Sequence, residues 1–251
     1  MKAFTLLFLA HLLGDYYFQP ERLARSKSRS IGWVLLHSAI YAASAGLTLL
    51  LLGGGYIWAV AVSAAAHLVI DVVKQLILNT SAKQGVLTVA GERAAFAADQ
   101  ALHVAVMLAA SIWVTRSFEL IEPPFMADIA EATGRSTYTL IAYAAICLAV
   151  LKPANVFIRR MLFTEKPDDA AAAHGSARAG RLIGCLERLL VVALLALKQY
   201  GSVALVFTAK SIARFRQLDD RGFAEYYILG TLLSVVTAVG AFILLKLFGC
   251  A

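Results

Sequence analysis

Histidine and aspartate recur four positions apart inside three apolar segments of the chain. The pairs are His11 with Asp15 in HLLGD, His67 with Asp71 in HLVID, and Asp99 with His103 in DQALH. A lone histidine, His37, lies in a fourth apolar segment, WVLLHSAIY. Residues four apart lie on one face of an α-helix. If these segments are helical, three of them therefore present an imidazole beside a carboxylate.

These residue types suit a divalent metal ion. Imidazole nitrogens and carboxylate oxygens on facing helices are ligands of zinc, manganese and iron. We expect the ligands to come from His11, Asp15, His37, His67, Asp71, Asp99 and His103. The carboxylates Asp15, Asp71 and Asp99 are also the candidates for a catalytic base. Alternatively, the His–Asp pairs form a proton relay without metal, and the residue types allow both.

Three further polar residues flank these pairs. Gln19 and Gln100 are expected to orient ligands from outside the coordination shell. Lys74 follows Asp71 by three residues in HLVIDVVKQ. That spacing predicts a local ion pair between the two side chains. The alternative role for Lys74 is a cation that binds phosphate beside the centre.

A second set of polar residues occurs in the C-terminal half. It comprises Glu187, Arg188, Lys198, Lys210, Arg214 and Glu225. We expect these residues to form structural ion pairs, with Glu225 pairing with Lys210 or Arg214. The alternative is a cationic pocket that binds an anionic lipid headgroup.

The composition excludes an ordinary soluble domain. Hydrophobic residues make up 60% of the 251 residues, charged residues only 16%, and the mean hydropathy is +0.74. Soluble domains are about 45–50% apolar and about 25% charged. The net charge of +7 is concentrated between apolar runs. It is therefore explained by membrane topology and lipid headgroups, and we expect membrane lipid, not nucleic acid, as the partner.

The apolar runs predict an all-α fold, a polytopic transmembrane helix bundle with about seven spans, within a range of six to eight. A span needs about 20 apolar residues. The expected spans are 3–19, 32–52, 56–78, 94–115, 137–158, 182–213 and 223–248. The run 182–213 is either one long tilted helix or a hairpin that breaks near residues 198–202.

The spans group into two modules within one integrated membrane domain. Residues 1–115 form a four-helix module that carries the His/Asp pairs. Residues 116–251 form a second helical module with a cytoplasmic loop at 159–181, mobile over 164–180.

Loop charges predict the orientation. The loops 20–31 and 159–181 are rich in lysine and arginine, whereas the 116–136 loop is acidic. The positive-inside rule places the basic loops in the cytoplasm, which makes the N-terminus external. At about 1.5 Å per residue, all seven His and Asp residues then fall in the cytoplasmic leaflet. We expect the side chains of the six paired residues to line one shared cavity between the first four helices, with His37 within it or at its edge, because charges that face lipid would each cost several kcal/mol. This cavity should open to the cytoplasm.

The strings HLLGDYYFQP, HLVIDVVKQ and DQALH, together with the lone histidine of the second span, resemble an uncharacterised bacterial membrane family, domain-of-unknown-function family 3307. The resemblance is strongest over about residues 1–115, and the strings LERLLVV, AKSIARF and AEYYILGTLLS extend it into the second half. It implies a protein of the bacterial inner membrane and carries no substrate or mechanism.

The polar constellation predicts a metal-dependent, membrane-embedded hydrolase that acts on a lipid or lipid-linked phosphate at the cytoplasmic leaflet. A bound metal lowers the pKa of water to about 7 and polarises the bond to be cleaved. Two other classes remain open. One is a transporter or channel for ions or small molecules that uses the His/Asp site. The other is a membrane sensor without catalysis, in which the cationic residues of the second half bind a ligand.

Overall fold

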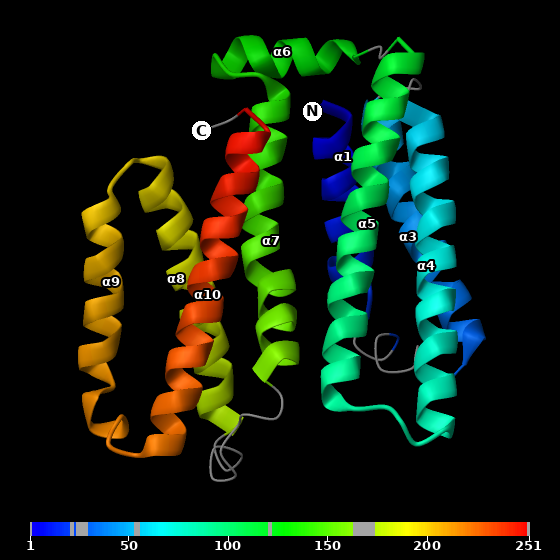
Figure 1. The fold of residues 1–251 in the computed structure, drawn as a ribbon. Coiled ribbons are helices and arrows are strands. Elements are labelled where there is room, and N and C mark those ends of the chain that lie inside the picture. The colour runs from blue at the N-terminus through cyan, green and yellow to red at the C-terminus, as the bar shows by residue number, and fades with distance from the viewer. Residues whose placement is uncertain are drawn as a thin grey trace. The chain divides into compact units, whose positions relative to one another are not determined.

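The computed structural model describes residues 2–20, 23, 30–52, 56–119, 122–162 and 174–249, without the side chains of 49–52 and 174–178. These residues form helices and no strands (Figure 1). The predicted all-α fold is therefore confirmed. Most of the predicted basic loop 20–31, namely residues 21–22 and 24–29, lies outside the described residues.

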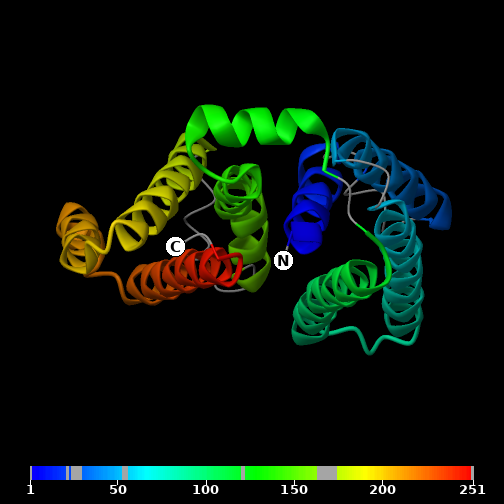
Figure 2. The ribbon, with the colours of Figure 1, turned by 90° about the horizontal axis from the view of Figure 1, so that it is seen from above.

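The first four expected spans form one helical group. They correspond to α1 (Lys2–Leu12) with the π-helix η1 (Leu13–Tyr17), α3 (Ile31–Leu52), α4 (Ile57–Lys83) and α5 (Val89–Ser117). Helix α4 packs against both α3 and α5, and α1 packs against all three (Figure 2). Small residues allow the close packing of α1 on α3, where Ala10 meets Tyr41 and Ala45 in a buried cluster.

The acidic stretch 116–136 contains a helix that we predicted as loop. Helix α6 (Pro124–Thr133) begins with proline at its first turn, where the missing N–H is harmless. It ends at Gly134, which adopts the left-handed conformation with φ of 64°. Both residues are helix boundary signals, so this helix was detectable in the sequence.

The C-terminal half contains α7 (Thr137–Leu162), α8 (His174–Ala196), α9 (Tyr200–Ala213), the short 3₁₀ helix η4 (Phe215–Gln217) and α10 (Arg221–Leu247). The long run therefore breaks, as the hairpin alternative proposed. The break lies at Lys198, whose φ of 58° is left-handed and incompatible with a continuing helix. Helix α9 then returns alongside α8 (Figure 1).

The predicted cytoplasmic loop 159–181 is shorter than expected. Helix α7 continues to Leu162 and α8 already begins at His174, so residues 174–180 are helical and the prediction that they form a mobile loop is wrong. Alanine and arginine are strong helix formers and outweigh the glycines of this segment. Residues 163–173, the remainder of the predicted loop, lie outside the described residues.

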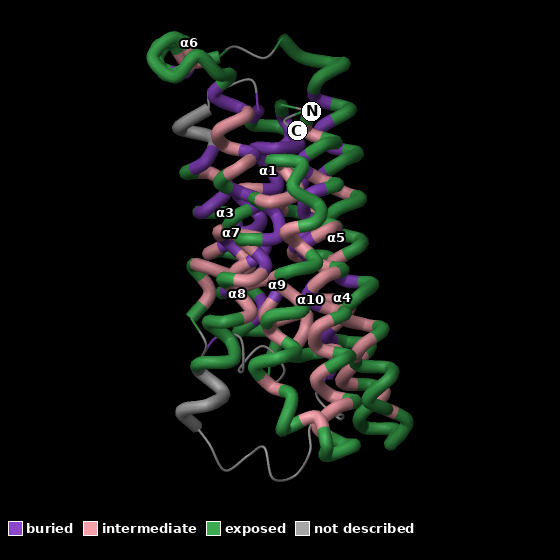
Figure 3. The backbone as a smooth tube through the Cα atoms, turned by 90° about the vertical axis from the view of Figure 1, so that its left-hand side faces the viewer, coloured by how far each residue is buried: buried purple, intermediate pink, exposed green. Residues whose placement is uncertain are grey.

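In the described part of the chain, five helices are long and apolar enough to cross a membrane, namely α3, α4, α5, α7 and α10, and α9 is a shorter apolar helix. Their outward faces are apolar: Val69, Ile77 and Val236 are each more than half exposed. In Figure 3, α4 and α5 are coloured mostly as exposed or intermediate. Such apolar outer faces suit lipid better than water, and they support a membrane protein.

The chain divides into two compact units, Met1–Ala145 and Ile146–Ala251. We predicted a boundary after residue 115, but α6 and the start of α7 belong to the first unit. Contacts within that unit explain the difference. The hydroxyl of Thr137 donates to the carbonyl of Met126 over 2.6 Å, and the hydroxyls of Tyr56 and Tyr138 lie 3.1 Å apart.

Candidate functional site

All seven predicted His and Asp residues meet inside the first unit. Helix α1 supplies His11, the π-helix Asp15, α3 His37, α4 His67 and Asp71, and α5 Asp99 and His103. Six are buried, and the side chain of Asp15 is 12% exposed. Burial of this many ionisable groups in an apolar bundle is unfavourable unless they satisfy one another or a ligand.

The end of the first helix is shaped to bring Asp15 inward. Asp15 lies in the π-helix Leu13–Tyr17, and single π-helical turns are frequent at functional sites. The preceding Gly14 packs closely on α3. A Cβ atom at Gly14 would lie 2.9 Å from Cδ2 and 3.2 Å from Cα of Tyr41. Glycine therefore allows the π-helix to approach α3 closely enough for Asp15 to reach its histidine.

Asp15 joins three histidines from three helices. Its Oδ1 atom lies 2.9 Å from Nε2 of His37 and 3.4 Å from Nε2 of His67. Its Oδ2 atom lies 3.9 Å from Nε2 of His11. One carboxylate on a short non-α-helical turn thus contacts side chains from α1, α3 and α4.

The four imidazole rings form a connected group. Ring centroids lie 5.1 Å apart for His37 and His67, 4.5 Å for His67 and His103, and 5.2 Å for His11 and His103. The ring of Tyr41 stacks on His67 with centroids 3.8 Å apart. The stacked tyrosine shields one face of His67 and fixes the direction of its nitrogens.

Several of these nitrogens are buried without a hydrogen-bond partner among the described residues. They are both ring nitrogens of His37 and His67, Nδ1 of His11 and Nε2 of His103. The approach of Asp15 to His37 and His67 is therefore close without hydrogen-bond geometry. Leaving a buried polar atom unpaired costs about 1–3 kcal/mol. This set of unused nitrogens is the strongest indication that the centre binds something.

A second carboxylate group lies where α4 meets α5. Nζ of Lys74 lies 3.0 Å from Oδ1 of Asp71 and 2.8 Å from Oδ1 of Asp99. The predicted local ion pair with Asp71 is therefore present, and Lys74 also bridges the two helices. Nδ1 of His103 lies 2.7 Å from the carbonyl oxygen of Asp99. A neutral His103 that donates from Nδ1 leaves Nε2 as a potential ligand.

Three overlapping sets of three side chains could each hold a metal ion. Within each set, every side chain offers one ligand atom, and these three atoms lie within 4.8 Å of one another. The sets are His11, Asp15 and His67; His37, His67 and Asp71; and Asp71, Asp99 and His103. Mixed imidazole and carboxylate donors fit zinc, manganese or iron. The assignment of individual residues as ligands or as catalytic base stays a prediction.

Two tyrosines belong to this network that we did not predict as site residues. Tyr41 stacks on His67. The hydroxyl of Tyr16 donates to Oε1 of Gln100 over 2.7 Å, and Nε2 of Gln100 donates to Oδ2 of Asp99 over 3.0 Å. Gln100 thus orients Asp99, whereas Gln19 makes no polar contact with the described part of the centre. Tyr16 follows Asp15 directly in the sequence, which was the available signal.

Two helices that carry the centre, α4 and α5, are longer than the predicted spans. Helices α4 and α5 extend beyond the spans 56–78 and 94–115 at the ends where they are joined. His67 and His103 therefore lie near the middle of their helices. Their placement in the cytoplasmic leaflet, and a cavity that opens to the cytoplasm, stay predictions.

The predicted ion pairs of the second half form with different partners. Lys210 pairs with Glu187, with 2.6 Å between Nζ and Oε2. Glu225 pairs with Arg221 over 3.0 Å at the surface, so its predicted pairing with Lys210 or Arg214 is wrong. The reason is local: Arg221 precedes Glu225 by one helical turn. Lys198 lies at the break after α8 and therefore does not share one continuous helix with Glu187.

Arg188 is a deeply buried cation of the second unit, 2% exposed. Its Nε donates to the carbonyl of Val150 and its Nη2 to Oδ1 of Asn155, each over 2.7 Å. Its Nη1 lies 3.4 Å from Oγ of Ser234. These contacts join α8 to α7 and α10, which makes Arg188 a structural residue of this unit.

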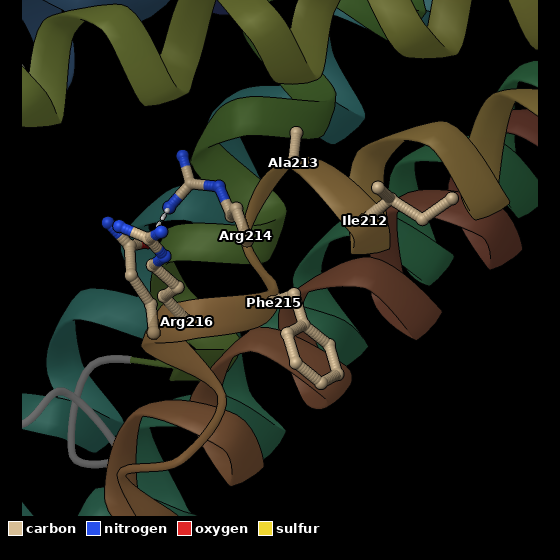
Figure 4. A pocket seen from close by; sticks show the side chains of 6 residues that line it. Ile212, Ala213, Arg214, Phe215 and Arg216 are labelled. Carbon is tan, nitrogen blue, oxygen red and sulfur yellow. Dashed lines mark hydrogen bonds between the residues drawn. The ribbon is translucent and has the colours of Figure 1, made fainter.

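A pocket at the end of α9 involves none of the His/Asp residues. It is lined by the consecutive residues 212–217, including Arg214, Phe215 and Arg216 (Figure 4). Nη1 of Arg214 lies 3.3 Å from Oε1 of Gln217. Neither arginine pairs with a carboxylate among the described residues, which leaves both guanidinium groups available to an anion.

The comparison with known families agrees with these observations. Residues 3–126 match the family model described as a protein of unknown function, DUF3307. The matched region contains the whole His/Asp centre and ends before the second half, where we also noted similar strings. No curated protein and no solved structure matches the chain. The chain belongs to the DUF3307 family.

Proposed function

We propose that the His/Asp centre binds a divalent metal and that the protein is a membrane-embedded hydrolase of a lipid or lipid-linked phosphate. One observation carries the proposal: four histidines and three aspartates meet in a buried centre, and six of its ring nitrogens have no hydrogen-bond partner among the described residues. Zinc, manganese and iron all fit this donor set. A hydrogen-bonded packing role would leave fewer of these nitrogens without partners.

The chemistry would be the addition of water to a phosphate ester. The oxygen of water would bond to phosphorus while the bond from phosphorus to the leaving oxygen breaks. One proton of the water would pass to a carboxylate, and the resulting carboxylic acid would give that proton to the leaving oxygen, which departs as an alcohol. A bound metal supplies an activated water and polarises the phosphate. Asp15 is the least buried of the three carboxylates and the best placed to accept that proton.

We further propose that the protein lies in the bacterial inner membrane with its N-terminus outside. The hairpin of α8 and α9 supports this orientation. Because α9 returns alongside α8, the basic residues Lys210, Arg214 and Arg216 lie at the same end of this unit as the start of α8. The positive-inside rule then assigns that end to the cytoplasm.

The test is phosphate release in proteoliposomes from a panel of phospholipids and isoprenoid-linked phosphates, with Zn²⁺, Mn²⁺ or Fe²⁺ added. The wild-type protein should release phosphate in a metal-dependent manner, and His67→Ala should not. Ser63→Ala is the matched control, because Ser63 is buried on the same helix one turn away. Equal phosphate release by wild type and His67→Ala would contradict the proposal.

A metal-ion transporter is the second candidate, favoured by two observations. His67 and His103 lie near the middle of their helices, and the first helix loses its α-helical form at Asp15. Transporter sites lie near the bilayer midplane on interrupted helices. Measurement of metal uptake with an indicator inside the same liposomes separates the two functions, since a hydrolase releases phosphate without moving metal.

A further inference from the structure

The ammonium group of Lys74 lies between two carboxylates of the centre. Its Nζ is within 3.0 Å of an oxygen of Asp71 and within 2.8 Å of an oxygen of Asp99. The two carboxylate side chains are 4% exposed, whereas that of Lys74 is 24% exposed. The lysine thus extends from the more accessible side toward two buried carboxylates on different helices.

This ammonium competes with metal for the same oxygens. Asp71 and Asp99 form, with His103, one of the three sets that could hold an ion. A metal bonds carboxylate oxygens at about 2.0–2.2 Å. An ammonium that donates to Asp71 and forms an ion pair with Asp99 occupies that space and already provides the positive charge that a metal would bring.

The opposite end of the centre consists mainly of histidines and contains no lysine among the described residues. His11, His37 and His67 surround Asp15, and their rings carry most of the nitrogens without a hydrogen-bond partner. Imidazole nitrogens are good ligands for zinc, manganese and iron. The histidine-rich end therefore needs a cation, whereas the carboxylate end already has one.

We propose that the ammonium group of Lys74 occupies the position of a second metal ion between Asp71 and Asp99. The centre therefore binds one metal ion, at the histidine-rich end. The inference rests on the proposed metal centre. It adds the number of metal ions that the centre binds and names Lys74 as the residue that sets this number. Removal of the lysine charge opens a second metal site formed by Asp71, Asp99 and His103. Lys74 is a positioning residue here, because it acts through the two carboxylates.

The test measures Mn²⁺ bound per chain in the full-length purified protein, together with the electron paramagnetic resonance spectrum. Wild type and Lys74→Arg should each bind one equivalent with the spectrum of an isolated ion. Lys74→Met keeps the length of the side chain without its charge and should bind two equivalents with the signature of a coupled pair. One equivalent in a folded Lys74→Met, or two in the wild type, overturns the inference. No metal in any variant overturns the proposed metal centre instead.

A second variant tests the inference if Lys74→Met does not fold. Asp99→Asn keeps Lys74 and removes one charge from the carboxylate end. The inference predicts that Asp99→Asn still binds one equivalent of Mn²⁺, because the metal lies at the other end. Loss of that equivalent would place the metal at Asp99 and contradict the inference.

Discussion

Oδ1 of Asp15 lies 2.9 Å from Nε2 of His37, a contact that joins the π-helix after α1 to the buried face of α3. The same oxygen lies 3.4 Å from Nε2 of His67 on α4. Asp15 therefore connects the end of the first helix to α3 and α4. Loss of its charge should affect the whole histidine-rich end.

We predict that Asp15→Asn weakens metal binding by at least about tenfold, since even partners outside the coordination shell contribute 10–100-fold to affinity. The substitution preserves size and removes the charge that offsets the metal. Titration of the purified protein with Zn²⁺ measures the change. Glu122→Gln, at a surface ion pair with Lys2 in the same unit, is the control that should leave affinity unchanged. An unaltered affinity in Asp15→Asn would remove Asp15 from the ligand set.

Gly14→Ala should destabilise the protein by about 1–3 kcal/mol, the usual cost of overpacking. The added Cβ would lie 2.9 Å from Cδ2 and 3.2 Å from Cα of Tyr41, and the backbone cannot yield easily. Gly46→Ala on α3 is the matched control, because nothing lies within 4 Å of its Cβ position. Thermal denaturation in detergent compares them. Equal melting temperatures for the two variants would show that the close approach at Gly14 is unimportant.

Arg188→Met should destabilise the second unit, because Asn155 and the Val150 carbonyl lose a donor inside the bundle. Each unpaired buried group costs about 1–3 kcal/mol. The expected result is a lower melting temperature with metal content unchanged, since no described contact of Arg188 involves the His/Asp centre. Arg221→Met, at a largely exposed side chain, should have no effect. A loss of metal in Arg188→Met alone would contradict a purely structural role.

Arg214 and Arg216 should bind the phosphate of anionic lipids. Guanidinium groups bind phosphate strongly, and the adjacent Ile212 and Phe215 are about 70% exposed. Native mass spectrometry of wild type and Arg214→Gln/Arg216→Gln in mixed-lipid nanodiscs should show fewer retained anionic lipids in the variant. Substitution of Lys246, at the other end of α10, is the control. The same number of retained lipids in all three proteins would refute this site.

Much of the fold followed from hydropathy, because the core of a bilayer imposes helices of a minimum length. The spacing of four residues in HLLGD, HLVID and DQALH predicted one polar stripe per helix, and the structure brings these stripes together. The contact of Lys74 with Asp99 and the network of Arg188 were not predicted. Both join residues on different helices. Such contacts depend on how the helices rotate and pack against one another, and the spacing of residues within one helix does not predict this. Helix α6 was missed although Pro124 and Gly134 marked its ends.

The most direct test of the metal centre is the metal content of the full-length protein purified without chelator, measured by inductively coupled plasma mass spectrometry. We expect about one equivalent of zinc, manganese or iron per chain in the wild type and in Ser63→Ala. His67→Ala should lose most of this metal, because His67 belongs to two of the three donor sets. Absence of these metals from the wild type, with no binding when they are added back, would contradict the account.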